Sequence, residues 1–234
     1  MTSGMEKMLI EKDRAGKRID RTGLDTHELC IDKKHFENYK KKINYEYNSR
    51  GFRDVEWPVD FSDSICCIGD SYTEGLGQPF EETWPQLLQL KTGKTCINLG
   101  VNGASAESMR MRAESAVKTH KAKNVVIMWS FVHRRRINGK DMHYDDRGRE
   151  GFNDKADLEN FLHNFDLANK LEAKIVNTVV PNAFWNERME YVVDKKTNNA
   201  LIKFKQLDFA RDGYHFDILT CQNITELVAK NLNI

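Results

Sequence analysis

From about residue 61 onward, short apolar runs alternate with segments whose apolar residues recur at helical spacing. The apolar runs 64–69, 95–100, 124–132 and 174–180 predict four buried strands. The amphipathic segments 81–93, 105–120, 154–173 and 217–232 predict helices, and Ser105, Ser108 and Asp217 stand near the expected N-termini of two of them. This alternation favours an α/β fold with a parallel sheet between helices. Ligands bind such sheets at the carboxyl ends of their strands, here at loops 69–77, 100–105, 130–155 and 181–199.

Residues 1–60 have a different character, because charged and aromatic residues interleave in them. The stretch KKHFENYKKKINYEYNSRGFRD contains the aromatic residues Phe36, Tyr39, Tyr45, Tyr47 and Phe52, which are candidate anchors. We expect residues 1–60 to form an extension packed on a main domain of residues 61–234. Stacking of RNA on these aromatics is the alternative, although no nucleic-acid motif accompanies them.

The charge balance argues against an obligate nucleic-acid or acidic-lipid partner. Lys and Arg total 36 against 35 Asp and Glu, which gives a formal net charge of +1. No window approaches the roughly 20 apolar residues of a membrane helix, and the N-terminus has no secretory pattern. Five cysteines without CxxC spacing predict reduced thiols and no metal site. We therefore expect a cytoplasmic protein without a membrane partner.

Three short stretches carry candidate chemistry. In CCIGDSYTEGLG, Ser71 follows the first predicted strand, either as a solvated turn residue or as a nucleophile. In ARDGYHFD, Asp212 and His215 are three residues apart, which suits a base with its orienting acid or an ordinary surface turn. In NLGVNGAS, Gly103 either presents its N–H to the site or gives a helix start its turn geometry.

In chain order, CCIGDSYTEGLG after the first predicted strand, NLGVNGAS after the second and ARDGYHFD before the last predicted helix resemble the GDSL/SGNH hydrolase family. NSRGFRD (48–54) and FEETWPQLL (80–88) extend the resemblance to roughly residues 48–230. It implies a three-layer α/β/α sandwich with a flavodoxin-like parallel sheet, and ester hydrolysis without a cofactor. By the same resemblance Ser71 is the nucleophile, His215 the base and Asp212 the orienting acid, while the N–H groups of Ser71 and Gly103 form the oxyanion hole.

The chain departs from the family after the third strand, where members usually carry an asparagine that completes the oxyanion hole. Here VVIMWSFVHRRR has Val132 or His133 near that place, and Ser130 or His133 is a candidate replacement. The loop 133–150 that follows is either solvated or uses Arg134 to bind an anionic substrate group. In the loop after the fourth strand, Trp185 either stacks on a substrate or closes the core.

These observations favour a serine esterase that hydrolyses short-chain acyl esters of small molecules, with acylated carbohydrates as expected substrates. Two alternatives stay open at this point. The altered third motif suits a binding or structural module with weakened catalysis, and the same three residues would also serve an acyltransferase.

Overall fold

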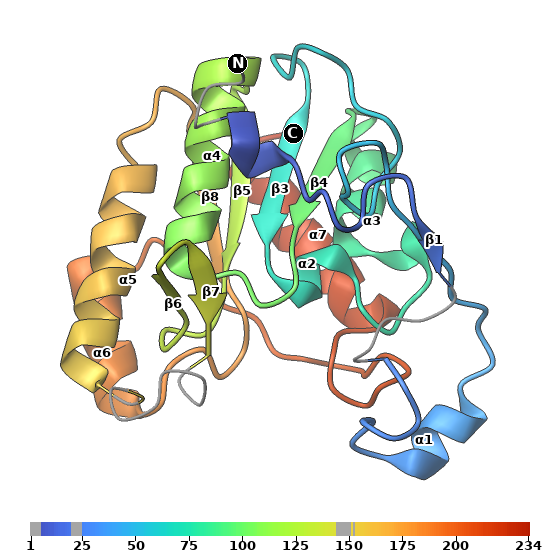
Figure 1. The fold of residues 1–234 in the computed structure, drawn as a ribbon. Coiled ribbons are helices and arrows are strands. Elements are labelled where there is room, and N and C mark those ends of the chain that lie inside the picture. The colour runs from blue at the N-terminus through green and yellow to red at the C-terminus, as the bar shows by residue number, and fades with distance from the viewer. Residues whose placement is uncertain (1–5, 20–24, 144–150, 152) are drawn as a thin grey trace.

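The computed structural model describes residues 6–19, 25–143, 151 and 153–234, and its strands form one central sheet and two small ones (Figure 1). The helices are α1 (Lys33–Asn38), α2 (Ser71–Glu74), α3 (Trp84–Thr92), α4 (Ala106–His120), α5 (Asp154–Ala168), α6 (Glu187–Lys196) and α7 (Ile218–Leu232), with short 3₁₀ turns η1 (Glu6–Leu9) and η2 (Phe80–Glu82). The strands are β1 (Arg18–Ile19), β2 (Tyr45–Glu46), β3 (Ile65–Gly69), β4 (Cys96–Gly100), β5 (Asn124–Trp129), β6 (Arg135–Ile137), β7 (Lys140–Met142), β8 (Lys174–Val179) and β9 (Leu201–Ile202).

The central sheet has the order β4-β3-β5-β8-β9, and all its strand pairs are parallel. Counted along the chain, the second strand lies at one edge and the first lies beside it, which is the flavodoxin-like order. The strand order therefore reverses between β3 and β5. The loops that follow these two strands flank the switch point, where open α/β sheets bind ligands. The predicted fold class is confirmed.

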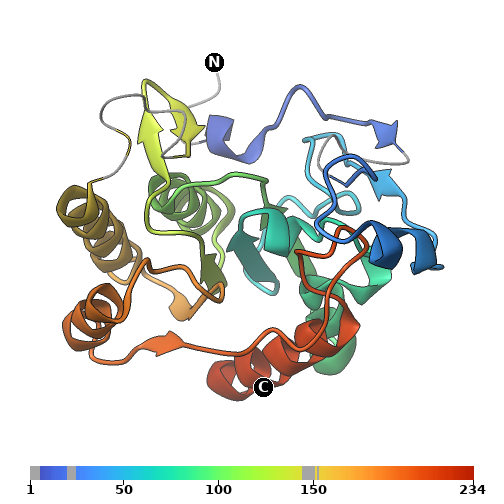
Figure 2. The same ribbon diagram turned by 90° about the horizontal axis from the view of Figure 1, so that it is seen from below.

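Helices cover both faces of this sheet. Figure 2 shows α4 and α5 on one face and α3 and α7 on the other, with α6 beside the β9 edge. Every residue of β3 and β4 is buried, as two covered faces require, and large side chains such as Trp84, Trp129 and Phe161 fill the two interlayers. The burial on both faces explains why these strands have continuous apolar sequences instead of alternating ones.

The helix ends follow the polar residues at their termini. The Ser105 side chain accepts a hydrogen bond from the Ser108 N–H at the start of α4, which makes Ser105 the N-cap. Gly93 ends α3 in the left-handed conformation at φ 67°. Strand β5 ends at Trp129, earlier than the predicted 132, because the chain then turns into the loop that carries Ser130.

Two elements at the β9 edge of the sheet were missed by the sequence pattern. The predicted loop 181–199 contains helix α6, which buries only Met189 and Val193 and is rich in charged residues. Strand β9 has two residues, too few for an alternating pattern. Within the predicted loop 130–155, β6 and β7 form an antiparallel hairpin, and residues 144–150 lie outside the described residues.

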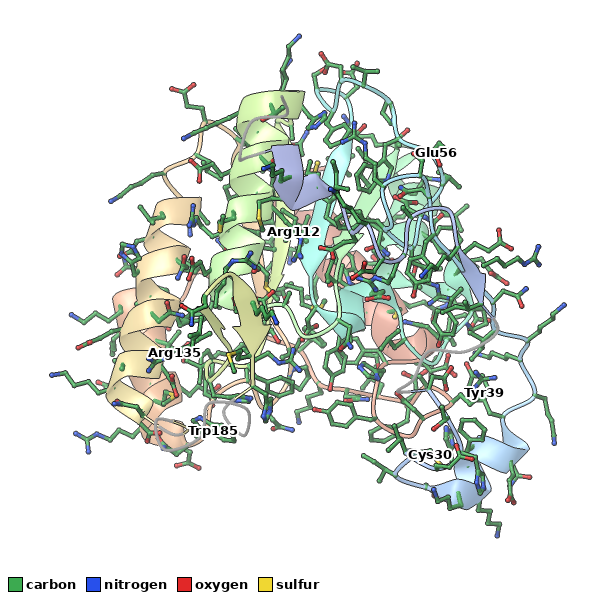
Figure 3. The ribbon with its side chains drawn as sticks, in the orientation of Figure 1. Cys30, Tyr39, Glu56, Arg112, Arg135 and Trp185 are labelled. Carbon is green, nitrogen blue, oxygen red and sulfur yellow. The ribbon has the colours of Figure 1, made fainter. Side chains whose placement is uncertain are left out.

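The N-terminal residues 6–19 and 25–60, which we call the arm, run along one side of the main domain. Strands β1 and β2 of the arm pair with each other. Tyr45 and Tyr47 are buried in a small apolar cluster with Leu76, while Leu9 and Phe52 enter the main core. In Figure 3, Tyr39 and Cys30 mark the part of the arm at the lower right of the molecule.

Within the described part of the chain, none of the helices combines the length and apolar character needed to cross a bilayer. The same residues contain no group of three His, Cys, Asp or Glu side chains arranged to hold a metal ion. All five cysteines are buried and unpaired with one another.

Candidate active site

Ser71 lies at the carboxyl edge of the central sheet, where β3 gives way to α2. Gly69, the last residue of β3, pairs with Gly100 at the end of β4, so the loops after both strands leave the sheet side by side. The Asp70 carboxylate accepts a hydrogen bond from the Tyr72 N–H and makes Asp70 the N-cap of α2. Ser71 is therefore the first residue of a helical turn at the edge where ligands bind.

His215 and Asp212 come from the loop before α7 and meet Ser71 at this edge. The His215 Nε2 lies 2.8 Å from Ser71 Oγ, and its Nδ1 lies 2.5 Å from Asp212 Oδ2. All three side chains are buried, with exposed fractions of 2–5%. Ser71 and His215 are 144 positions apart in the sequence. The structure thus brings the three residues into one hydrogen-bonded chain.

The carboxylate of Asp212 determines which imidazole nitrogen of His215 carries the proton. Burial opposes ionisation of Asp212, but the His215 side chain and the N–H groups of His215 and Tyr214 outweigh it and lower the pKa of this carboxyl. An ionised carboxylate accepts hydrogen bonds and donates none, so Nδ1 of His215 must carry the proton. In neutral His215, Nε2 is then free to accept the proton of the Ser71 hydroxyl.

Close packing against Gly77 holds the loop of Asp212 beside the turn that follows α2. A Cβ built on Gly77 would lie 2.9 Å from Ala210 Cβ and 3.3 Å from Asp212 Cγ, and the residue has φ 77°. Only glycine fits both the space and the left-handed conformation. The Arg211 N–H donates to the Gly77 carbonyl at 2.9 Å, so the two loops are also joined through their backbones. This contact explains the glycine-rich end of the GDSYTEGLG stretch.

Two backbone N–H groups at this edge are available to a negatively charged oxygen. Within the described residues, neither the Ser71 N–H nor the Gly103 N–H donates to another protein group. Gly103 follows β4 and has φ 76°, which turns its peptide group at the start of the loop. An unpaired backbone N–H group is the kind of donor that can stabilise an oxyanion.

Ser130, a candidate for the missing oxyanion donor, uses its hydroxyl elsewhere. Its O–H donates to Asp70 Oδ2, and its oxygen accepts from Arg134 Nη1 at 2.6 Å. Arg134 Nη1 also donates to Asp70 Oδ2 at 2.6 Å. Asp70, Ser130 and Arg134 therefore form a closed group, which we call the nucleophile-side cluster, and Arg134 neutralises a carboxylate that is fully buried next to Ser71.

His133 and Trp185, the other predicted site residues, contact each other. Their rings stack with centroids 4.4 Å apart, and His133 also stacks on Phe131. Trp185 is about one-third exposed and lies at the α6 side of the molecule (Figure 3). The structure thus places both residues in an aromatic group beside the hairpin β6–β7.

A cavity of about 760 Å³ opens beside the segments that carry Ser71, Asp212 and His215, and none of these three residues lines it. Tyr72 and Tyr214, the neighbours of Ser71 and His215 in sequence, line it, and the Tyr72 ring lies 4.6 Å from that of His215. Further aromatic walls come from Phe131, Phe184, Phe204 and Phe209, and Lys205 and Gln206 add polar groups. The cavity thus combines flat aromatic faces with polar and charged side chains, which also include Asn182, Glu190 and Lys203.

The sequence analysis missed two polar residues that shape this site, Glu74 and Asp70. Glu74 is buried in α2, and its carboxylate accepts from the Asn102 N–H beside Gly103 at 2.8 Å. Both acids stand in a turn between apolar runs, where a buried charge must have a partner. That placement was the available signal, but the partners lie far away in sequence.

No family model matches this chain, and no curated protein matches it either. Among solved structures it is similar to the psychrotrophic esterase EstA from Pseudoalteromonas sp., in a structure inhibited by monoethylphosphonate. The identity is 19%, the TM-score is 0.45, and the match covers 73% of this chain and 94% of the esterase.

Two further solved structures are similar at comparable levels. One is a member of the lipolytic protein G-D-S-L family from Veillonella parvula, with 16% identity, a TM-score of 0.46 and coverage of 72% of this chain and 97% of that one. The other is a family two carbohydrate esterase from Clostridium thermocellum in complex with cellohexaose, with 15% identity, a TM-score of 0.49 and coverage of 76% and 66%.

Proposed function

We propose that this protein is a serine ester hydrolase of the GDSL/SGNH type in which Ser71 is the nucleophile. The observation that carries the proposal is the buried chain of hydrogen bonds from Ser71 Oγ through His215 to Asp212. A serine hydroxyl becomes an effective nucleophile when a base accepts its proton and an acid orients that base. The order of the sequence motifs supports the same assignment.

In the proposed reaction, Ser71 Oγ attacks the ester carbonyl while His215 Nε2 takes the hydroxyl proton. The resulting oxyanion is stabilised by the N–H groups of Ser71 and Gly103. Collapse of this intermediate breaks the bond to the alcohol, which leaves with the proton from Nε2. A water molecule, deprotonated by His215, then attacks the acyl-enzyme and releases the acid with Ser71 restored. Asp212 stabilises the imidazolium form of His215 in both halves.

For the substrate, we propose a short acyl group on a carbohydrate or similar ring-bearing alcohol. The aromatic walls of the cavity beside Tyr72 and Tyr214 support this choice, because sugar rings stack on aromatic faces. The rate of hydrolysis of acetylated sugars should therefore exceed the rate for the corresponding octanoyl esters. The reverse preference would favour an acyl-binding role for the cavity.

The direct test is covalent labelling with a fluorophosphonate, followed by mass spectrometry of the modified peptide. We expect the adduct on Ser71, and we expect Ser71→Ala to abolish both labelling and hydrolysis of p-nitrophenyl acetate. Ser62→Ala, a change near the opposite end of β3, is the matched control and should retain full activity.

Three results would change the proposal. A protein that is not labelled and does not hydrolyse esters would be a binding or structural module. Hydrolysis that survives Ser71→Ala undiminished would place the nucleophile elsewhere. Transesterified product formed in preference to free acid, when an acceptor alcohol is supplied, would identify an acyltransferase.

A further inference from the structure

The arm contacts both halves of the candidate active site. In Figures 1 and 2 its blue segments run beside α2 and beside the loop that precedes α7. These are the segments that carry Ser71 on one side and Asp212 and His215 on the other. Because the arm contacts both of these segments, we infer that it does more than cover apolar surface of the main domain.

On the side of Ser71, two residues of the arm donate hydrogen bonds to the Glu74 carboxylate. Glu74 Oε1 accepts from Arg14 Nη1 at 2.6 Å and from the Tyr47 hydroxyl at 2.9 Å, and the guanidinium lies over the Tyr47 ring. The carboxylate is 1% exposed. Burial alone would lower the pKa of Arg14, but the charge and hydrogen bond of Glu74, together with smaller contributions from Tyr47 and Glu11, more than offset it and raise this pKa. Arg14 thus stays charged, and its positive charge compensates the negative charge of the buried Glu74 carboxylate.

The other oxygen of Glu74 contacts the loop after β4 that contains Gly103, which we call the oxyanion loop. Glu74 Oε2 accepts from the Asn102 N–H at 2.8 Å, and Asn102 directly precedes Gly103. The carboxylate therefore connects the arm, helix α2 and the loop that presents the Gly103 N–H. If both arm donors were lost, Glu74 would have to find new partners, and its hold on Asn102 would loosen.

On the acid–base side, the arm acts on Arg211, the neighbour of Asp212. The buried Asp25 accepts from Arg211 Nε at 3.0 Å and Nη2 at 2.6 Å. It also accepts from the Tyr45 hydroxyl, whose oxygen accepts from the Gly77 N–H at 2.9 Å. The Ile31 N–H donates to the Asp212 carbonyl at 3.0 Å. The arm therefore joins the turn after α2 to the loop of Asp212.

We propose that the arm is a positioning element of the active site, with Arg14 and Tyr47 acting through Glu74 to hold the oxyanion loop in place. Asp25 does the same for the Asp212 loop through Arg211. This inference rests on the proposed function, since it assigns the arm a part in the same reaction. Arg14, Tyr47 and Asp25 are positioning residues that do not contact the reacting atoms.

The test is the double variant Arg14→Met/Tyr47→Phe, which removes both arm donors to Glu74 and keeps the side-chain bulk. We expect kcat for p-nitrophenyl acetate to fall about 10- to 100-fold with KM changed less than about threefold, because misplacement of a catalytic group acts on the chemical step. Amide hydrogen exchange at Asn102 should become at least about tenfold faster. Arg14→Lys, which keeps a charged donor, should recover part of the lost kcat.

The matched control is Arg18→Met, which breaks an exposed ion pair with Glu46 in the same arm. It should leave kcat and the exchange rate of Asn102 unchanged. Thermal unfolding of each variant shows whether the chain is folded, and Tyr47→Phe alone, which deletes one hydroxyl, replaces the double variant if that one does not fold.

Activity and exchange separate the possible results. If the parent hydrolyses esters and the folded variant keeps kcat within about twofold with unchanged exchange at Asn102, the inference is wrong. If the parent neither hydrolyses esters nor is labelled at Ser71, the proposed function fails by itself. In that case, faster exchange at Asn102 still supports the hold of the arm on the loop, and unchanged exchange overturns it.

Discussion

The same three side-chain types, Ser, Asp and Arg, meet in two places, once beside Ser71 and once where the hairpin β6–β7 contacts α4. In the nucleophile-side cluster, the Ser130 hydroxyl donates to Asp70 and accepts from Arg134. In what we call the hairpin cluster, the Ser108 hydroxyl donates to Asp141 at 2.7 Å and accepts from Arg136 at 2.8 Å. The two arginines are two residues apart in the chain, yet their surroundings differ.

The difference lies in burial and in what stands next to each carboxylate. Asp70 is fully buried and its oxygen lies 2.6 Å from Arg134, whereas Asp141 is 17% exposed and lies 3.8 Å from Arg136. Asp70 precedes Ser71, so an unbalanced charge there would oppose the oxyanion that forms during the proposed reaction. Asp141 joins the hairpin β6–β7 to the start of α4. The same triplet thus neutralises a buried carboxylate beside Ser71 in one place and fastens a hairpin in the other.

The largest expected effect comes from removing the two arginines in turn. Arg134→Met leaves Asp70 buried without a cation and should lower the free energy of unfolding by about 3 kcal/mol. It should also lower kcat about 10- to 100-fold, because the remaining charge disfavours the transition state. Arg136→Met should cost less than about 1 kcal/mol, since water can solvate Asp141. Denaturant unfolding and hydrolysis of p-nitrophenyl acetate measure both.

The kinetic pattern of Arg134→Met also tests the role that the sequence suggested for this residue. If Arg134 binds an anionic group of the substrate, its loss should raise KM for an anionic ester and leave kcat for neutral p-nitrophenyl acetate unchanged. A fall in kcat for the neutral ester supports the neutralising role instead. Equal effects of the Arg134 and Arg136 variants would remove the distinction between the clusters.

The contrast between these clusters also shows how far sequence patterns reach. Four strands of the central sheet, β3, β4, β5 and β8, were predicted from apolar runs, and such runs are local signals. The candidate site was predicted because Ser71 and the pair Asp212 and His215 lie in short motifs with a fixed order. Helix α6 escaped notice because it is short and six of its ten residues are charged, so only Met189 and Val193 are buried.

The partners of buried charges could not be predicted in the same way. Arg134 meets Asp70 across 64 positions and Arg14 meets Glu74 across 60, and no spacing rule connects residues that far apart. A run such as HRRR looks like a solvated segment until the fold shows which arginine faces a buried carboxylate. The polar contacts that support the site are therefore a product of tertiary structure.

A smaller effect is expected when both charges of the nucleophile-side cluster are removed together. Asp70→Asn/Arg134→Met should be about 2 kcal/mol more stable than Arg134→Met alone, because no uncompensated charge remains. Asparagine also serves as an N-cap, so its amide oxygen can still accept from the Tyr72 N–H and begin α2. Denaturant unfolding of the two single variants and the double variant gives the coupling free energy. Additive effects would contradict a direct charge pair.

The smallest effect should come from the two serine hydroxyls. Ser130→Ala deletes a group that already donates to Asp70 and accepts from Arg134, and these two can still pair directly at 2.6 Å. We therefore expect kcat within about threefold of the parent value and a loss of about 1 kcal/mol in stability, as for one hydrogen bond. Ser108→Ala is the matched control and should cost a similar amount of stability with no change in kcat. If Ser130 were the missing oxyanion donor, its loss would lower kcat by a factor on the order of 10²–10³. The kcat values of Ser130→Ala and Ser108→Ala would then differ by the same factor. A small effect in both would leave the oxyanion to the N–H groups of Ser71 and Gly103, with Arg134 keeping the edge free of uncompensated negative charge.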